Sequence, residues 1–182
     1  MRIDDNLAVT FQIGERHIYH TPISRETFEA NYRLIAATKA VLFDTTDQAL
    51  VLDGPILASL VLRDEGRQLA KRRGEDGDSG AQSLLDEIER LTMAIGPDLD
   101  LIPVSTSGVD QDEWQEALSR LVFFTVNYAL APKIEKARRA ASVCAILHFE
   151  PISLSAEAWK ASLRTSTKPA TTAKKAASSV PV

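Results

Sequence analysis

The sequence has a single cysteine, Cys144, among its 182 residues. One cysteine cannot form an intramolecular disulfide, so packing and hydrogen bonds must hold the fold, and nothing indicates an oxidising compartment. The residues around Cys144 follow a helical pattern. We therefore expect its thiol to be a small core side chain on a helix.

Long apolar runs are also missing. The longest apolar stretch, residues 121–131, is interrupted by Thr125 and Asn127, and it is far shorter than the roughly 20 residues that a membrane-crossing helix needs. The first five residues, Met-Arg-Ile-Asp-Asp, lack the apolar segment of a signal peptide. We therefore expect no membrane partner and a location in the cytoplasm.

Residue patterns that carry catalysis or bind metals are scarce. His17 and His20 are three residues apart on an expected strand, which places them on opposite faces, and His148 has no partner histidine. No serine or cysteine lies in a recognisable nucleophile motif. We expect ordinary surface or packed histidines, no metal, no cofactor and no enzymatic activity.

The acidic segment at residues 74–80, GEDGDSG, matches a calcium-binding loop only in part. Gly80 stands where such a loop needs an oxygen ligand, and Ala81 stands where it needs glycine. The segment also lacks the Gly-Lys-Ser/Thr sequence of a phosphate-binding loop. It is therefore expected to be a solvated surface loop.

Apolar and polar side chains alternate near the start of the chain, which is the period of a half-buried strand. The apolar set occupies positions 7, 9, 11 and 13, and Gly14 suits the first central position of a type II′ turn. We expect residues 1–22 to form a β-hairpin on the outside of the molecule. Its open strand edge would be available to another chain.

The pattern of the following residues predicts helices. Several of them begin at a capping residue with one apolar residue before it and another at the fourth helical position. Such pairs are Ile23/Phe28, Val109/Trp114 and Leu154/Trp159. The expected helices begin at Ser24, at Pro55 after Asp53-Gly54, near Leu84, at Asp110 and at Ser155, and Ile134 to Leu147 continues the fourth of them as an Ala-rich helix.

Two glycine or proline signals mark the expected helix ends. Gly96-Pro97 should stop the third helix after Ile95, and Pro132 should break the fourth. Residues 98–108 are expected to be irregular. We predict a mainly α fold, a single helical domain of four to five helices with an N-terminal hairpin, led by the helix from Asp110 to about Leu130.

The C-terminal tail differs from the rest in composition. The net charge is −4, and the four cations after Leu163 are the only charges there, so the remaining chain carries −8. We therefore separate a body, residues 1–163, from a disordered basic tail rich in Ala, Thr, Ser and Lys, residues 164–182. An acidic body argues against nucleic-acid binding, because it would repel the phosphates. Glu135 also interrupts the basic stretch that runs from Lys133 to Arg139.

Three segments carry a family resemblance. They are Tyr19-His20-Thr21-Pro22-Ile23-Ser24-Arg25-Glu26 running into Phe28-Glu29-Ala30-Asn31-Tyr32, then Leu121-Val122-Phe123-Phe124-Thr125-Val126-Asn127-Tyr128, and Ser153-Leu154-Ser155 before the Ser/Thr/Pro/Ala-rich end. Together they resemble tail assembly chaperones of tailed bacteriophages and prophages. The resemblance covers most of the chain and rests on structural motifs.

The resemblance implies a non-enzymatic protein of the bacterial host cytoplasm that binds the tape-measure protein and helps recruit tail-tube subunits. Self-association is compatible with this role. The alternative is a structural virion component of the tail, such as a tail-completion or tube-associated protein. A small nucleic-acid-binding regulator is a less favoured third interpretation.

A partner surface is expected on the hairpin edge and on the exposed side of the helix that begins at Ser24, because an uncovered strand edge pairs readily with another chain. The candidate partner-binding residues are Thr10, Gln12, Tyr19, Glu26, Glu29 and Arg33.

Overall fold

The protein is described by a computed structural model that covers residues 7–44, 48–75, 80–96 and 100–166. Six α-helices are present in these ranges: α1 Arg25–Leu42, α2 Gln48–Arg73, α3 Gln82–Arg90, α4 Gln111–Ala129, α5 Lys136–Leu147 and α6 Ala156–Ser166. The strands are β1 Ala8–Ile13, β2 Arg16–His20, β3 Thr92–Ile95, β4 Leu101–Pro103 and β5 Glu150–Ile152, and two short 3-10 helices are η2 Val104–Thr106 and η3 Lys133–Glu135.

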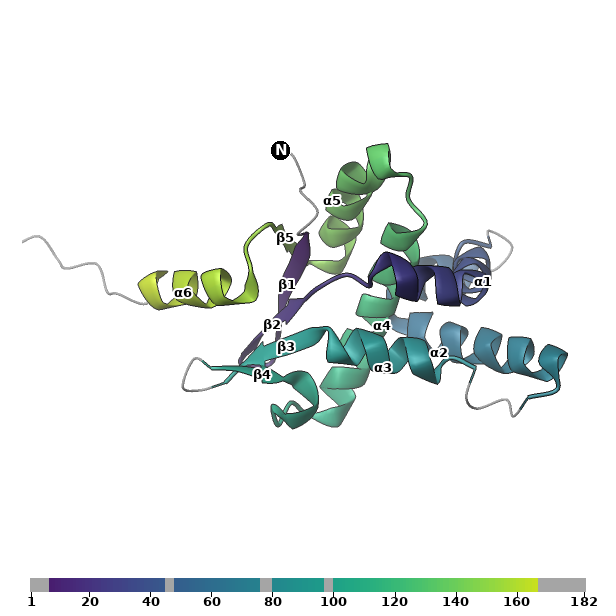
Figure 1. Ribbon diagram of the computed structural model, residues 1–182, viewed down its shortest axis with the longest axis horizontal. Coiled ribbons are helices and arrows are strands. Elements are labelled where there is room, and N and C mark those ends of the chain that lie inside the picture. Colours follow the sequence, from purple (N-terminus) through teal and green to yellow (C-terminus); the bar gives the residue numbers. More distant parts are fainter. Residues whose placement is uncertain (1–6, 45–47, 76–79, 97–99, 167–182) are drawn as a thin grey trace, which may run out of the picture.

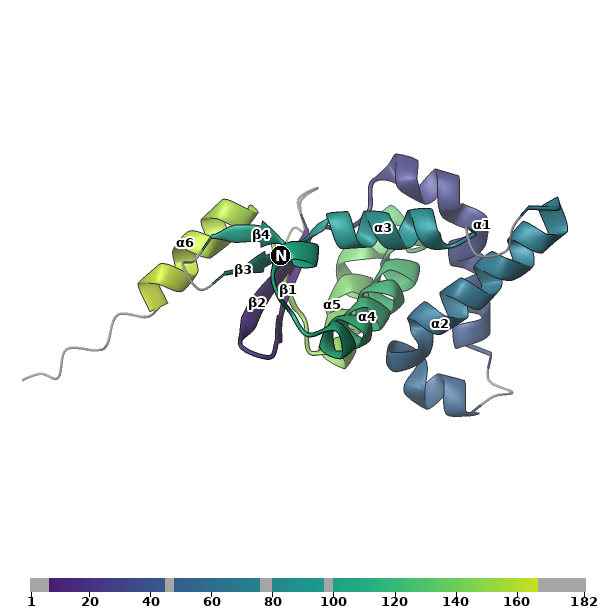
Figure 2. The same cartoon turned by 90° about the horizontal axis from the view of Figure 1, so that it is seen from below.

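These elements form layers. The helices α1 to α5 lie to one side of the sheet, and α6 lies on its other side (Figures 1 and 2). On the first side Ile18 and Ala94 pack near Ala117 of α4, and on the second side Tyr19 packs with Trp159 of α6. The prediction of a mainly helical protein with an N-terminal hairpin is confirmed at this level, although the described ranges hold six helices where four to five were expected.

The position of the hairpin differs from the prediction. The sheet order is β4-β3-β2-β1-β5 and every neighbouring pair is antiparallel, so the hairpin lies at the centre of the sheet and not on the outside. Strand β3 covers β2, and β5 covers β1 from Ala8 to Thr10. Gly14 has φ 52° in the turn, which glycine adopts without steric cost.

Both edges of the sheet are short and end in or contain proline. Strand β4 has 3 residues and ends at Pro103, and β5 also has 3 residues with Pro151 in its middle. Proline cannot donate a ladder hydrogen bond, so these edges are poor templates for pairing with another chain. We therefore expect neither β4 nor β5 to pair readily with a strand of another protein.

Helix α4 is central to the helical core, as expected. Phe124 is fully buried, and its ring stacks on Tyr128 at 5.4 Å and meets His20 edge-on at 6.5 Å. The side chain of Asp110 caps the helix by accepting the N–H of Asp112 and that of Glu113. Ser24 caps α1 in the same way through the N–H of Thr27.

Two helix boundaries are wrong in the prediction. Helix α2 begins at Gln48, so Pro55 lies inside it and not at its first position, and the helix lacks one backbone hydrogen bond there. Helix α3 ends at Arg90, and the residues expected to continue it to Ile95 form β3, which pairs with β2. Pairing with a distant strand overrides the local helical pattern there.

The segment from residue 98 to residue 108 is more regular than expected, because it contains β4 and η2. At the other end, α6 continues to Ser166, three residues beyond the predicted boundary of the body at Leu163. The remaining tail, residues 167–182, lies outside the described residues, and so does the prediction of its disorder.

Candidate binding groove

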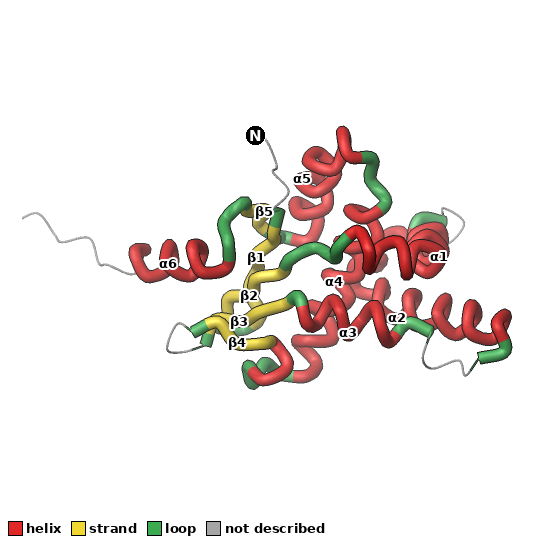
Figure 3. Tube along the Cα trace, viewed as in Figure 1, coloured by secondary structure: helices red, strands yellow, loops and turns green. Residues whose placement is uncertain are grey.

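Three helices begin around one hollow of about 940 Å³ on the molecular surface. Arg25, Lys136 and Ala156, the first residues of α1, α5 and α6, all line it. Figure 3 shows α1 and α6 each beginning after a loop that leaves a strand, and α5 beginning at its end farther from the strands. We call this hollow the binding groove.

The lining of the binding groove is part polar and part apolar, and we call its four largest apolar and aromatic side chains apart from Tyr19 the apolar floor. These are Leu7, Ile23, Tyr128 and Leu154, and the side chain of Leu154 is 45% exposed. The hydroxyl of Tyr19 donates a hydrogen bond to the backbone oxygen of Leu154 at 3.0 Å. This bond ties the connection between β5 and α6 to the sheet, and so it fixes one wall of the groove.

Burial raises the pKa of Tyr19 above its ordinary value, although a hydrogen bond with Thr21 acts in the opposite direction. The phenol therefore stays neutral at physiological pH and contributes no negative charge to the groove.

The rim of the groove is basic. Arg25 pairs with Glu29 at 2.7 Å, and the Nζ atom of Lys136 lies 4.9 Å from the centre of the Tyr128 ring. In the described ranges neither Lys133 nor Lys136 forms an ion pair, and no carboxylate lines the groove. Each helix start adds roughly half a positive charge through the helix dipole. The groove is therefore positive, although the body as a whole is acidic.

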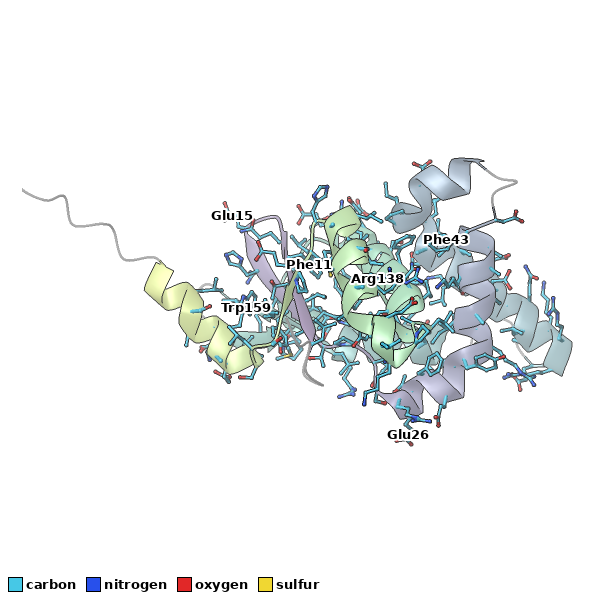
Figure 4. All side chains as sticks on the ribbon, turned by 90° about the horizontal axis from the view of Figure 1, so that it is seen from above. Phe11, Glu15, Glu26, Phe43, Arg138 and Trp159 are labelled. Atoms are coloured by element: carbon cyan, nitrogen blue, oxygen red, sulfur yellow. The ribbon has the colours of Figure 1, made fainter. Side chains whose placement is uncertain are left out.

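The structure does not bring the predicted partner-binding residues together. Tyr19 is buried at 7% exposure and contributes to the groove. Thr10 is buried at 4%, and β5 covers it, so the expectation of an open hairpin edge is wrong at this residue. The three residues on α1 are exposed and lie outside the groove: Glu26, Glu29 and Arg33. Figure 4 shows Glu26 at the start of α1, far from Trp159 beside the strands.

Only one end of β1 keeps an open edge. Strand β5 stops opposite Thr10, so in the described sheet no strand pairs with residues 11–13 on that side. Gln12 is exposed there and lines a second hollow of about 440 Å³. The ring of Phe11 stacks on Phe149 at 4.3 Å, which holds this end of the strand against the helices.

The histidines and the cysteine lie as their sequence positions predict. His17 faces Trp159 with ring centroids 6.3 Å apart, while His20 faces Phe124 on the other side of the sheet. Cys144 is buried on α5, and burial raises the pKa of its thiol to about 11. Within the described ranges, His, Cys, Asp and Glu side chains form no group of three or more that could hold a metal ion.

Sequence reasoning missed the groove, although it found the parts. Local patterns predict the helix starts at Ser24 and Ser155, the basic residues after Pro132 and the packing of Leu154 in an apolar pair. Tertiary contacts bring the three helix starts to one hollow. No local pattern in the sequence reports such contacts.

No helix in the described part of the chain combines the length and apolar character needed to cross a membrane. Comparison of the chain with protein-family models, with curated proteins and with solved structures finds no match.

Proposed function

We propose that this protein is a non-enzymatic tail assembly chaperone of a tailed bacteriophage or prophage. In this proposal it holds a segment of the tape-measure protein in the binding groove and helps recruit tail-tube subunits in the host cytoplasm. The resemblance of residues 19–32 and 121–128 to such chaperones supports the family part of the proposal.

The observation that carries the proposal is the character of the groove. An apolar floor with a charged rim suits a protein segment that buries apolar side chains and leaves polar ones at the margin. Leu154 is 45% exposed on that floor, and Ile134, next to Lys133 on η3, is 93% exposed. Exposed apolar side chains beside a groove gain free energy when a partner covers them.

Substituting Leu154→Asp tests this proposal. The change places a charge on the apolar floor, and it should reduce capture of the co-expressed tape-measure protein by about tenfold or more. Ile146→Asp is the matched control, because Ile146 is an apolar residue of α5 that is 59% exposed and does not line the groove.

Equal capture by the two variants would exclude the groove as the binding site. Mass spectrometry of purified particles addresses the role itself, since a chaperone should be missing from them. Recovery of the protein from the particles would favour the structural virion component.

The open end of β1 provides a second, separate test of the expected hairpin surface. Gln12 lies beyond the last residue that β5 covers, and Ile13 and Arg16 flank the tight turn, so the Gln12 N–H points away from β2. Gln12→Pro should therefore preserve the hairpin and weaken tail-tube or tape-measure binding if this edge takes part. Thr10→Pro is unsuitable, because Thr10 pairs with Glu150 within the sheet.

A further inference from the structure

We infer that the binding groove selects an acidic, amphipathic protein segment, whose carboxylates lie at the rim and whose apolar side chains lie on the floor. This inference rests on the proposed function and names the chemistry of the partner segment. It is carried by the convergence of three helix starts and three basic side chains over an apolar floor.

The charge of the groove is opposite to that of its surroundings. The chain without its tail cations carries −8, whereas Arg25, Lys133 and Lys136 are the charged residues on the groove. Because Arg25 already pairs with Glu29, the two lysines supply most of the uncompensated side-chain charge. An acidic segment approaching this body is repelled at most places and attracted here, which favours one docking position.

The helix starts strengthen this preference. The helices α1, α5 and α6, which have 18, 12 and 11 residues, each place their first residue on the lining of this hollow. Each helix start favours an anion by about 0.3–1 kcal/mol at an exposed site. Carboxylates spaced along a segment in the groove can therefore meet helix starts as well as the lysines.

The surroundings of the groove are less suited to nucleic acid. Arg138 and Arg139 lie 3.6 Å and 3.9 Å from the same Glu135 carboxylate oxygen, so the basic stretch after Pro132 is partly neutralised. A phosphate backbone also carries no apolar side chains, so it would leave the apolar floor uncovered. A segment that carries both leucine-like and acidic side chains satisfies both parts of the groove.

Two labelled peptides test the inference on the full-length chain. One is built from Leu-Glu-Glu-Leu repeats, and the other has the same length with glutamine in place of every glutamate. By fluorescence anisotropy the acidic peptide should bind about tenfold more tightly than the glutamine peptide. NMR of the labelled protein should place the shifted signals at Lys133, Tyr128 and Leu154.

Two double variants separate the groove from general charge. K133Q with K136Q removes two cations from the groove and should weaken binding of the acidic peptide by about tenfold. R138Q with R139Q removes the same charge from the same region outside the groove and should change the affinity by less than about twofold. Lys133→Gln alone, at an exposed residue, replaces the first double variant if that variant does not fold.

Several outcomes overturn the inference. Equal binding of the two peptides, together with loss of tape-measure capture in Leu154→Asp, would leave the proposed function intact and remove the selectivity for acidic segments. Equal weakening by the two double variants would show attraction by general charge. Tighter binding of a thymidine oligonucleotide, or dimer formation that depends on Lys133 and Lys136, would identify nucleic acid or a second copy as the occupant.

Discussion

At the scale of single residues, His20 is the most constrained polar side chain of the sheet. Its Nδ1 lies 2.9 Å from Thr92 Oγ1, and that hydroxyl donates its own hydrogen to the backbone oxygen of Ile88 at 2.7 Å. Thr92 can therefore only accept from His20, so the Nδ1 atom carries the proton. The other ring nitrogen, Nε2, is buried without a hydrogen-bond partner among the described residues.

This geometry predicts a loss of stability in acid. Burial lowers the pKa of His20 from 6.5 to about 3, so below pH 6.5 the unfolded chain binds a proton that the folded chain does not. The stability contributed by neutral His20 is complete above pH 6.5 and falls as the pH is lowered toward 3, by up to about 1.4 kcal/mol per pH unit.

Urea unfolding at a series of pH values measures this effect. His20→Asn keeps a donor for Thr92 and removes the titrating ring. Between pH 7 and pH 4.5 its free energy of unfolding should therefore fall by about 2–3 kcal/mol less than that of the wild type. His17→Asn removes a histidine from the opposite face of the same strand and should retain the wild-type acid loss. An unchanged acid loss in His20→Asn would contradict the buried neutral state.

At the scale of elements, the crossing of α2 and the start of α3 depends on small residues. A Cβ atom added to Gly66 in α2 would lie 2.8 Å from both the Cβ and the backbone N of Ala81. Gly80 faces the backbone of Gly66 in the same close contact. The two segments therefore approach each other more closely than side chains would permit.

Gly66→Ala should consequently be destabilising, by about 1–3 kcal/mol in urea unfolding, because the new methyl group meets backbone that cannot easily move. The sign of this change in the free energy of unfolding is informative, because alanine normally stabilises a helix interior by about 1 kcal/mol over glycine. Gly54→Ala in the same helix is the control. Its Cβ would meet the Phe123 ring at 3.3 Å, and a ring edge can shift, so a smaller loss is expected.

An increase in stability for Gly66→Ala would show that α2 and α3 are not in close contact there.

The same scale shows how far the sequence predicts the fold. The sequence predicts the caps Ser24 and Asp110 correctly, because a cap is a local hydrogen bond between neighbours in the chain. The local pattern predicts a helix at residues 92–95, whereas they form β3, because their pairing partner β2 is far away in sequence. No local pattern predicts β5, because its three residues acquire their conformation from pairing with β1.

At the scale of the whole molecule, the binding groove exists only through the arrangement of layers. The sheet lies between α6 and the other helices (Figure 1), and the connection from β5 to α6 lines the groove together with the starts of α1 and α5. Trp159 anchors α6, with its ring 5.6 Å from that of Tyr19. The small cluster beneath α6 is separate from the main helical core, which contains Phe124.

We therefore predict that α6 opens independently of the helical core. By hydrogen–deuterium exchange with peptide-level mass spectrometry, the amides of α6 should exchange faster than those of α4, because a small contact area gives a low local opening free energy. Trp159→Ala should raise exchange in α6 by about tenfold or more and leave α4 unchanged, since it removes the main anchor of a single element.

The other tryptophan provides the control. Trp114 packs against both the main core and the cluster on the helix-facing side of the sheet, so Trp114→Ala should speed exchange in α4 and in the sheet as well. Equal acceleration of α4 by the two variants would mean that α6 and the core unfold as one unit. Since Leu154 and Ala156 belong to the wall of the groove, loosening α6 should also weaken binding of the acidic peptide without changing its preference over the glutamine peptide.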